Sequence, residues 1–450
     1  MTPQPHSYAD LGTYPDVETD IDSGTYTDFG TYMRESAGTL VVQPRMGMAH
    51  PTDMSAGLRA VAAIGVRAVG TITLDSYTRV GDHDSTRAAL RDPAAAGLNG
   101  FPLVAHGPAT TADVAAAAGR IPVQIRHGSA RPQDIFRTLA RAGLSVSEGG
   151  PVSYCLPYGR TPLAESVGNW RESTRQLADD CAALGRTAHL ETFGGCLLGQ
   201  LCPPSMLVAM SLLEGLFFLQ NGVRSISLSY AQQTHPVQDV EALAALGLLA
   251  GELIPDGVDW HRVLYTYMGV FPSTEAGAGL LMDRSAALAV RGGVERLIVK
   301  TVAEGRRLPT VAENVHALRA AAATAAATAA HGPAADPLPW AAEVDCSEVL
   351  TEARILVHTV LDLHEDIGTA LLRAFSAGLL DVPFCLHPDN RGLTQGAITE
   401  NGRLVWARTG RLPLPSRTGG TPRTRVGSTE LMRMLRHTAE QHDGSATKAP

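Results

Sequence analysis

Residues 121–150 read IPVQIRHGSARPQDIFRTLARAGLSVSEGG, and this stretch alternates between two kinds of pattern. The runs IPVQI (121–125) and LSVS (144–147) are short and apolar, which is typical of buried strands. Between them, PQDIFRTLARAG (132–143) has apolar residues at helical spacing and ends at a glycine. A strand, a helix and a second strand in this order predict one βαβ unit of a parallel sheet.

The same alternation extends over about residues 38–310. Nine runs have strand character: TLVVQP (39–44), AVGTITL (68–74), FPLVA (101–105), IPVQI (121–125), LSVS (144–147), TAHLET (187–192), SISLSY (225–230), RVLYTY (262–267) and RLIVK (296–300). This number of units matches a (β/α)8 barrel, which typically has about 250 residues, so we predict an α/β fold of the TIM type. One of the nine runs must then lie outside the barrel, and FPLVA is the weakest candidate.

The segments on either side of the predicted barrel differ from it in composition. Residues 1–36 are rich in Asp, Thr, Tyr and Gly, which predicts a solvated N-terminal arm that is partly disordered. We expect the barrel domain at 37–315 and a helical and irregular C-terminal extension at 316–416. Residues 417–450 predict a loose polar tail.

Composition limits the classes of function. Of 450 residues, 44% are hydrophobic and 18% charged, which indicates a globular protein, and the net charge of -8 argues against nucleic-acid binding. The six cysteines form no CxxC pair, so we expect reduced thiols in a cytoplasmic protein and no metal site. The chain start lacks the pattern of a signal peptide. The apolar run 206–219 contains Glu214 and is too short to span a membrane, so it predicts a buried helix.

The residues that follow the predicted strands suggest a binding site, because chemistry in such barrels occurs at the C-terminal strand ends. Arg45, Arg79 and Arg126 follow three of the strands, and Glu148 follows a fourth. Arginine binds carboxylates in a bidentate fashion. A single arginine there is more often structural, but three together favour a dicarboxylate or a phosphorylated ligand. With Glu148 complementing a cationic group, an acidic amino acid fits this set.

Other residues at the predicted barrel mouth are less specific. His127 directly follows Arg126, and we expect it to contact the substrate, although most histidines of this chain suggest hydrogen-bonded structural residues. Gly47, Gly149 and Gly150 would allow a close approach of a ligand, but for any single glycine ordinary turn chemistry is the better explanation. Lys300 follows RLIV (296–299) at the end of the last predicted strand.

Nine segments resemble the large catalytic subunit of the glutamate mutase family, whose enzymes are also called methylaspartate mutases. They are QPRMGM (43–48), SYTR (76–79), LNGFP (98–102), RHG (126–128), EGGPVSYCLPYGRTPLAESVGNW (148–170), CPPSM (202–206), MGVFP (268–272), IVKT (298–301) and DVPF (381–384). Their order and rough spacing are kept from about residue 38 to 415. The SYxxPY block and the strand-end arginines are the most specific of these features. The N-terminal arm, the segment CLLGQLCPPS (196–205) and the Ala-rich 320–330 depart from the family.

The resemblance implies an isomerase that depends on adenosylcobalamin and interconverts L-glutamate and threo-3-methyl-L-aspartate by radical fragmentation and recombination. It also implies a (β/α)8 barrel subunit that forms a homodimer. A separate small subunit with a DxHxxG motif would bind the cobalamin and supply the cobalt-ligating histidine. The string DLHEDIG (362–368) in this chain has its glycine one position late and is interpreted as a chance match.

Carried over residue by residue, the resemblance places the two substrate carboxylates at Arg45, Arg79 and Arg126. The substrate ammonium falls at Glu148, which is also the candidate catalytic base. The substrate-contacting tyrosines fall at Tyr154 and Tyr158. The implied cofactor contacts are Gly47, Asn99, Pro157, Phe271, Lys300, Glu304 and Leu308.

Three other interpretations stay open at this point. The chain could be a cobalamin-dependent mutase of another small acid, because arginines recognise carboxylates and not chain length. It could be a non-catalytic barrel that binds an acidic ligand. A metal-dependent barrel hydrolase would need a cluster of His and carboxylate ligands, for which the sequence has no pattern.

Overall fold

Eight parallel strands form the centre of the computed structural model, which describes residues 28–91, 98–157, 159–197, 201–333, 338–415 and 426–446. The strands are β1 (Val41–Pro44), β2 (Gly70–Thr73), β3 (Val123–Arg126), β4 (Val146–Gly149), β5 (His189–Thr192), β6 (Ser225–Ala231), β7 (Asp259–Tyr265) and β8 (Arg296–Val299). They pair in the order β1-β8-β7-β6-β5-β4-β3-β2, and a bridge between Val42 and Ala68 joins β1 to the start of the β2 segment. The predicted (β/α)8 barrel is therefore confirmed.

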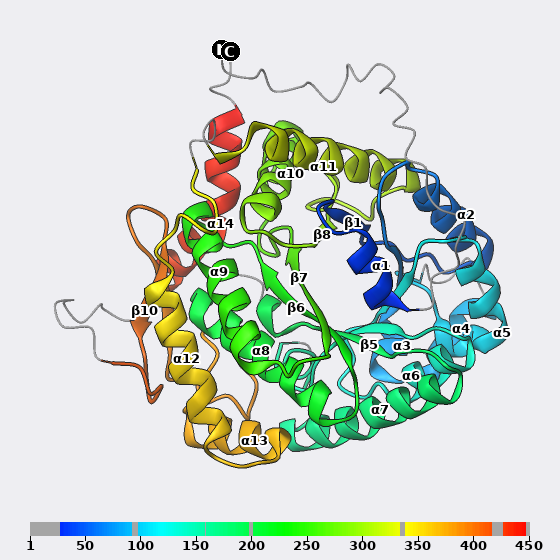
Figure 1. Ribbon diagram of the computed structural model, residues 1–450, viewed down its shortest axis with the longest axis horizontal. Coiled ribbons are helices and arrows are strands. Elements are labelled where there is room, and N and C mark those ends of the chain that lie inside the picture. Colours follow the sequence, from blue (N-terminus) through cyan, green and yellow to red (C-terminus); the bar gives the residue numbers. More distant parts are fainter. Residues whose placement is uncertain are drawn as a thin grey trace.

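Helices surround the strands on the outside, as Figure 1 shows. They are α2 (Pro51–Ala62), α3 (Ser76–Val80), α4 (His83–Arg91), α5 (Leu103–Ala116), α6 (Gln133–Arg141), α7 (Leu163–Ala183), α8 (Pro204–Gln220), α9 (Pro236–Leu253), α10 (Glu275–Arg291) and α11 (Val311–His331), with the 3-10 turn η1 (Gly194–Cys196) before α8. The run 101–105 is not a barrel strand, as expected: Phe101 makes one isolated bridge to Leu74, and α5 begins two residues later.

The most apolar helix, α8, is buried along almost its whole length. On one side it packs against β5 and β6, and on the other it packs against α12 (Ser347–Leu361). Contact on both sides explains why its sequence shows no polar face. The expectation of a buried helix over 206–219 is confirmed. No helix within the described ranges has the length and apolar character needed to cross a membrane.

The expectation of a solvated arm over residues 1–36 is wrong for its last part. Residues Phe29–Glu35 form helix α1, which Asp28 caps by accepting a hydrogen bond from the backbone N–H of Thr31 at 2.7 Å. Phe29, Tyr32 and Met33 are buried against Val41, Val69 and Val146 at the beginnings of strands. Burying these side chains stabilises the helix, and α1 closes the end of the barrel opposite the mouth. Residues 1–27 lie outside the described part.

The C-terminal boundaries also need correction. Helix α11 packs against α10 and β1 as the eighth barrel helix, so the boundary expected at 315 falls inside it. Beyond it lie α12, α13 (Ile367–Ala377) and a hairpin of β9 (Gln395–Ile398) and β10 (Leu404–Arg408). The expectation of a loose tail over 417–450 is wrong for α14 (Ser428–Ala446), which packs against α10. Asp443 of α14 accepts four hydrogen bonds from Ser273 and Thr274 at the start of α10.

Candidate active site

Every second residue of a strand points into the barrel, and these inward side chains form stacked layers. The lower layer is polar and closed. Arg296 of β8 and Glu191 of β5 form an ion pair in which both side chains are 0% exposed. The guanidinium of Arg296 also donates to Gln43, to Ser227 Oγ at 2.9 Å and to His261 Nε2 at 3.2 Å. Each nitrogen of Arg296 therefore has a partner, which makes this layer a structural one.

The layer above it carries the predicted ligand groups. Arg126 Nε lies 2.9 Å from Glu148 Oε2, and Arg126 Nη2 donates to Tyr265 Oη at 3.1 Å. The hydroxyl of Tyr154 donates to Glu148 Oε1, and that of Tyr265 lies 2.8 Å from Glu148 Oε2. Burial alone would lower the pKa of Arg126, but the charges of Glu148 and its neighbours hold this pKa well above its ordinary value. The guanidinium thus stays charged although only 5% of the residue is exposed.

Within the described residues, Nη1 of Arg126 is buried and has no hydrogen-bond partner. A buried donor without a partner costs about 1–3 kcal/mol, so such a group usually marks a place where a ligand binds or water sits. Nε of Arg79 is a second such group. Arg79 belongs to the short helix α3 after β2, and its side chain passes directly over Gly128. A Cβ atom at Gly128 would lie 3.1 Å from Arg79 Nε, which explains the glycine of the RHG segment.

The third predicted arginine lies in a different cluster of the mouth. Arg45 Nη1 pairs with Glu304 Oε1 at 2.6 Å, and Lys300 Nζ lies 3.0 Å from the same oxygen. The ammonium of Lys300 lies 5.1 Å from the ring centre of Phe271. Burial lowers the pKa of Lys300 to about 8, with Glu304 opposing this shift. Burial would raise the pKa of Glu304, but Arg45 and Lys300 lower it overall.

The loop after β4 follows a sharp path that needs its two glycines. Gly149 has a φ of 131°, and a Cβ atom there would lie 2.5 Å from the Trp170 ring. A Cβ atom at Gly150 would lie 2.0 Å from an oxygen of Glu214. Turn chemistry and close packing, and not a ligand, therefore explain both glycines. They let the chain turn back so that Tyr154 reaches Glu148.

Glu214 of α8 holds the beginning of this loop. Its carboxylate accepts hydrogen bonds from Val152 N at 3.1 Å, Ser153 N at 2.9 Å and Ser153 Oγ at 2.8 Å. Burial raises the pKa of Glu214 to about 7, against the effect of these hydrogen bonds. The single carboxylate in the apolar run 206–219 is thus an anchor for the residues next to Tyr154.

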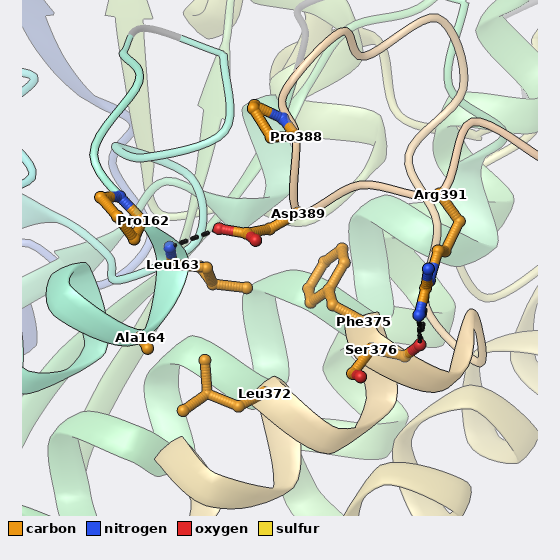
Figure 2. Close-up of a pocket in the computed structure, with 9 residues that line it drawn as sticks. All are labelled: Pro162, Leu163, Ala164, Leu372, Phe375, Ser376, Pro388, Asp389 and Arg391. Atoms are coloured by element: carbon orange, nitrogen blue, oxygen red, sulfur yellow. Dashed lines mark hydrogen bonds between the residues drawn. The ribbon is translucent and has the colours of Figure 1, made fainter.

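Residues of the C-terminal extension hold the other end of the loop. His387 Nε2 lies 3.0 Å from Thr161 O, and Asp389 Oδ2 accepts a hydrogen bond from Leu163 N at 2.7 Å. Figure 2 shows Asp389 reaching Leu163 at the start of α7, beside a cavity of about 240 Å³ between this helix and α13. The extension therefore supports the loop from outside the barrel.

Two of the remaining predicted residues, His127 and Gly47, are packed against neighbouring parts of the chain. His127 packs nearly parallel to the Trp170 ring at 5.7 Å and edge-on to Tyr154 at 5.2 Å. Burial, together with Arg79, lowers the pKa of His127 to about 3, so the ring is neutral near pH 7 and supports Tyr154. Gly47 lies under Thr73, whose carbonyl oxygen would be 2.3 Å from an added Cβ atom.

The other predicted cofactor contacts lie on the loops around the mouth. Asn99 is exposed and accepts a hydrogen bond from Ser76 N at 2.9 Å. Pro157 is half-buried after β4, and Leu308 is 67% exposed after β8. Tyr158 lies outside the described residues. The contacts of all these groups with substrate or cofactor stay predictions.

Sequence reasoning missed Glu191, Tyr265, Arg296 and the anchoring role of Glu214. The first three lie inside the predicted strands TAHLET, RVLYTY and RLIVK. The search for site residues considered only positions after the strands, so it did not include them. The alternation of inward and outward residues could have identified them, since Glu191 and Tyr265 have inward parity. Within the described part of the chain, no group of three or more His, Cys, Asp and Glu side chains could hold a metal ion.

The arrangement can bind a small molecule with two carboxylates and one ammonium. It offers three guanidiniums, two of which have buried nitrogen atoms without partners, and one buried carboxylate between two phenols. All of these groups lie at the C-terminal ends of strands or in the segments that follow those ends, around one mouth.

Known proteins with similar sequences identify the family of this chain. A family described as "Methylaspartate mutase E chain" matches residues 28–431. The "Glutamate mutase epsilon subunit" of Halobacterium salinarum is 30% identical over 398 residues, which cover 87% of this chain and 82% of that protein. The proteins of the same name from Haloarcula marismortui and Escherichia coli O157:H7 are each 31% identical, over 82% and 76% of this chain and 76% and 72% of their own lengths. The chain therefore belongs to the methylaspartate mutase E chain family, a family of mutases, which are isomerases.

Proposed function

We propose that this chain is the substrate-binding subunit of an adenosylcobalamin-dependent mutase that interconverts L-glutamate and threo-3-methyl-L-aspartate. The observation that carries the proposal is the buried Arg126, with Nη1 unpaired, beside the buried carboxylate of Glu148. A ligand with a carboxylate next to an ammonium matches this pair. The names of the relatives, glutamate mutase subunits, agree with such a ligand.

The three arginines suit a reaction that separates a substrate into two parts. Arg126 and Arg79 lie on neighbouring strand ends, whereas Arg45 lies with Glu304 and Lys300 after β1 and β8. In a fragmentation and recombination of glutamate, both fragments carry a carboxylate, so each needs its own anchor. Holding reactants oriented contributes up to about 7–11 kcal/mol to lowering a barrier. Separate guanidinium anchors supply this orientation.

Glu148 is the group that meets the substrate ammonium. It is 1% exposed and accepts hydrogen bonds from Tyr154 and Tyr265. These donors hold its oxygens in place without occupying every lone pair. Glu148 can therefore accept an ammonium proton during the reaction as well as bind the ammonium. His127 supports Tyr154 from behind and is proposed to border the substrate.

The residues proposed to hold adenosylcobalamin fit a large flat group placed across the mouth. They follow five different strands, namely Gly47 after β1, Asn99 after β2, Pro157 after β4, Phe271 after β7, and Lys300, Glu304 and Leu308 after β8. The exposed Leu308 offers apolar surface at the rim, while Lys300 offers a buried ammonium deeper inside. When bound, the cofactor supplies the radical that starts the rearrangement. The chain itself binds and orients the substrate and shields it from water.

The cobalt-ligating histidine is proposed to come from a separate small subunit with a DxHxxG motif, and this chain is proposed to form a homodimer. The string DLHEDIG supports this division, because it forms the turn between α12 and α13 on the outer layer. Asp366 caps α13 through Thr369 N at 2.7 Å, and the backbone N–H of Asp366 donates to His364 Nδ1 at 2.9 Å. Both side chains thus have structural roles away from the mouth.

The test is a reconstitution of this chain with adenosylcobalamin and a DxHxxG subunit from the same genome, measuring 3-methylaspartate formed from L-glutamate. We expect turnover only with all three components. Arg126→Lys should lower kcat/KM by roughly 10- to 100-fold, because a charge-assisted hydrogen bond contributes about 1.5–3 kcal/mol. Arg354→Lys is the matched control, since Arg354 pairs with Glu252 on the outside of the barrel.

Glu148→Gln separates the two roles of Glu148. It should reduce kcat much more than it weakens glutamate binding, and an unaltered kcat would exclude the base role. Cobalamin binding without turnover on glutamate would favour a mutase of another small acid. Glutamate binding without cobalamin binding would favour a non-catalytic acidic-ligand-binding barrel.

A further inference from the structure

Tyr265 occupies a position between two buried carboxylates. It is the last residue of β7 and is 0% exposed. Its hydroxyl oxygen lies 2.8 Å from Glu148 Oε2 on one side and within hydrogen-bond distance of Glu191 Oε1 on the other. Arg126 Nη2 donates to the same oxygen at 3.1 Å, and the Arg126 guanidinium lies 5.0 Å from the ring centre. One phenol therefore connects the ligand-binding layer to the structural layer below it.

A phenol has one proton and can donate to only one carboxylate at a time. Burial raises the pKa of Tyr265 well above its ordinary value, so the hydroxyl keeps its proton. When Glu148 and Glu191 are both ionised, the Tyr265 hydroxyl can donate its hydrogen bond to only one of them. When Glu148 carries a proton, both contacts are satisfied together, with Glu148 donating to Tyr265 and Tyr265 donating to Glu191.

Glu191 is a fixed alternative acceptor. Its Oε2 binds Arg296 and accepts from Gln124 Nε2 at 3.2 Å and Ser227 Oγ at 3.3 Å. These contacts hold the carboxylate in one orientation and leave Oε1 directed at Tyr265. Because Glu191 is 0% exposed, its position does not depend on bulk water.

We propose that Tyr265 is a positioning residue whose hydroxyl switches its hydrogen bond between Glu148 and Glu191 as Glu148 gains and loses a proton. The inference rests on the proposed function, because it assumes that Glu148 takes the ammonium proton. Tyr265 does not itself react in this scheme. It allows Glu148 to change its charge without leaving its place beside Arg126.

The proton movements balance within the site. The substrate ammonium loses a proton to Glu148, which becomes a neutral carboxyl group while the substrate nitrogen becomes a neutral amine. The O–H bond of Tyr265 stays intact and rotates from Glu148 Oε2 to Glu191 Oε1, and the new O–H of Glu148 donates to Tyr265 Oη. The reverse movements return the proton to the substrate nitrogen after the rearrangement.

The experiment compares Tyr265→Phe with Tyr230→Phe in the reconstituted enzyme. Tyr230 is also fully buried and donates to a carboxylate, Asp239, at 2.8 Å, but it lies between β6 and α9. Tyr265→Phe should lower kcat by roughly 10- to 100-fold, within the range of proton-transfer effects, and leave KM nearly unchanged. The pH profile of kcat should change as well, because the Glu148 carboxylate loses one of its two phenol donors.

Replacing Tyr265 by 3-fluorotyrosine keeps the shape and fold but makes the hydroxyl more acidic, and this variant covers the case in which Tyr265→Phe does not fold. The 3-fluorotyrosine enzyme should have an altered pH profile of kcat, because its hydroxyl is a stronger hydrogen-bond donor than that of tyrosine. A Tyr265→Phe enzyme that matches Tyr230→Phe in kcat and pH profile, or that changes only KM, overturns the inference alone. A pH profile of kcat that is unchanged in the 3-fluorotyrosine enzyme also overturns the inference alone. An inactive wild-type mixture overturns the proposed function, and this inference with it.

Discussion

Arg296 and Arg126 project into the same barrel, one layer apart, and differ in how their nitrogens are used. Arg296 is fully enclosed, and Glu191, Gln43, Ser227 and His261 occupy all of its nitrogens. Arg126 has Glu148 and Tyr265 as partners but keeps Nη1 buried and unpaired among the described residues. Burial and charge are nearly equal in the two cases. Only Arg126 of the two has a buried donor left without a partner, and this difference is the reason why we propose Arg126, and not Arg296, as a ligand-binding arginine.

The sharpest test of this comparison replaces each arginine by methionine. Arg296→Met should reduce the free energy of unfolding by about 3–5 kcal/mol, because it leaves Glu191 as a buried charge without its cation. Arg126→Met should reduce the free energy of unfolding clearly less, because it also removes an unpaired buried donor. It should, however, abolish glutamate binding. Urea unfolding followed by circular dichroism and calorimetric titration with glutamate measure the two effects. Equal losses of stability in the two variants would show that the unpaired nitrogen of Arg126 does not affect the free energy of unfolding.

Glu214 extends the comparison to a buried carboxylate that is held by backbone N–H groups instead of a cation. Burial raises its pKa to about 7 in the folded protein, above its ordinary value of 4.5. Folding therefore favours the protonated form, and this contribution to stability is full below about pH 4.5 and is lost as the pH rises through 7. Relative to Glu214→Gln, the wild type should lose roughly 3 kcal/mol over this range.

Urea unfolding of both proteins at several pH values between 4.5 and 7.5 measures the difference. Glu252→Gln serves as control, because Glu252 is a half-exposed carboxylate paired with Arg354. A constant difference between the wild type and Glu214→Gln across this range would contradict the raised pKa. Glu214→Ala should in addition loosen Ser153 and reduce turnover.

The smallest expected effect concerns the cluster around Arg45. Glu304 lies 3.0 Å from Lys300 Nζ and opposes the effect of burial, which lowers the pKa of Lys300 to about 8. Glu304→Gln should therefore lower the pKa of Lys300 further, by roughly one unit. Titration of the Lys300 ammonium by nitrogen-15 NMR measures this change. Glu313→Gln, in an exposed pair with Arg307, should leave the Lys300 titration as it is.

The barrel was predictable because its signals are local. Each strand and helix has its own periodicity within about ten residues, and eight of the nine strand candidates lie in the barrel. The strand-end arginines were predictable for the same reason, since the barrel rule places them at one mouth without further information. The ends of the chain were not predictable, because α1 and α14 are stabilised by distant contacts such as Phe29 with His189 and Asp443 with Thr274.

The residues of the site also differ in whether a local pattern could predict them. Arg126 and Glu148 were identified from their positions after strands, but Tyr265 was missed although it touches both. The hydrogen bond from Arg126 to Tyr265 joins residues 139 positions apart, and no local pattern records it. The same holds for Glu214, whose anchoring contacts with Ser153 cross 61 positions.

By itself, the sequence determined the eight-strand barrel and the location of the mouth, and it predicted the chemical kind of ligand. These properties depend on the period of apolar residues and on which side chains follow each strand. Only the tertiary structure decided which buried charges neutralise one another, which donor stays free and which phenol lies between two carboxylates. The physical reason is that pairing depends on distances of about 3 Å between side chains from different strands, and those distances are set when the barrel closes.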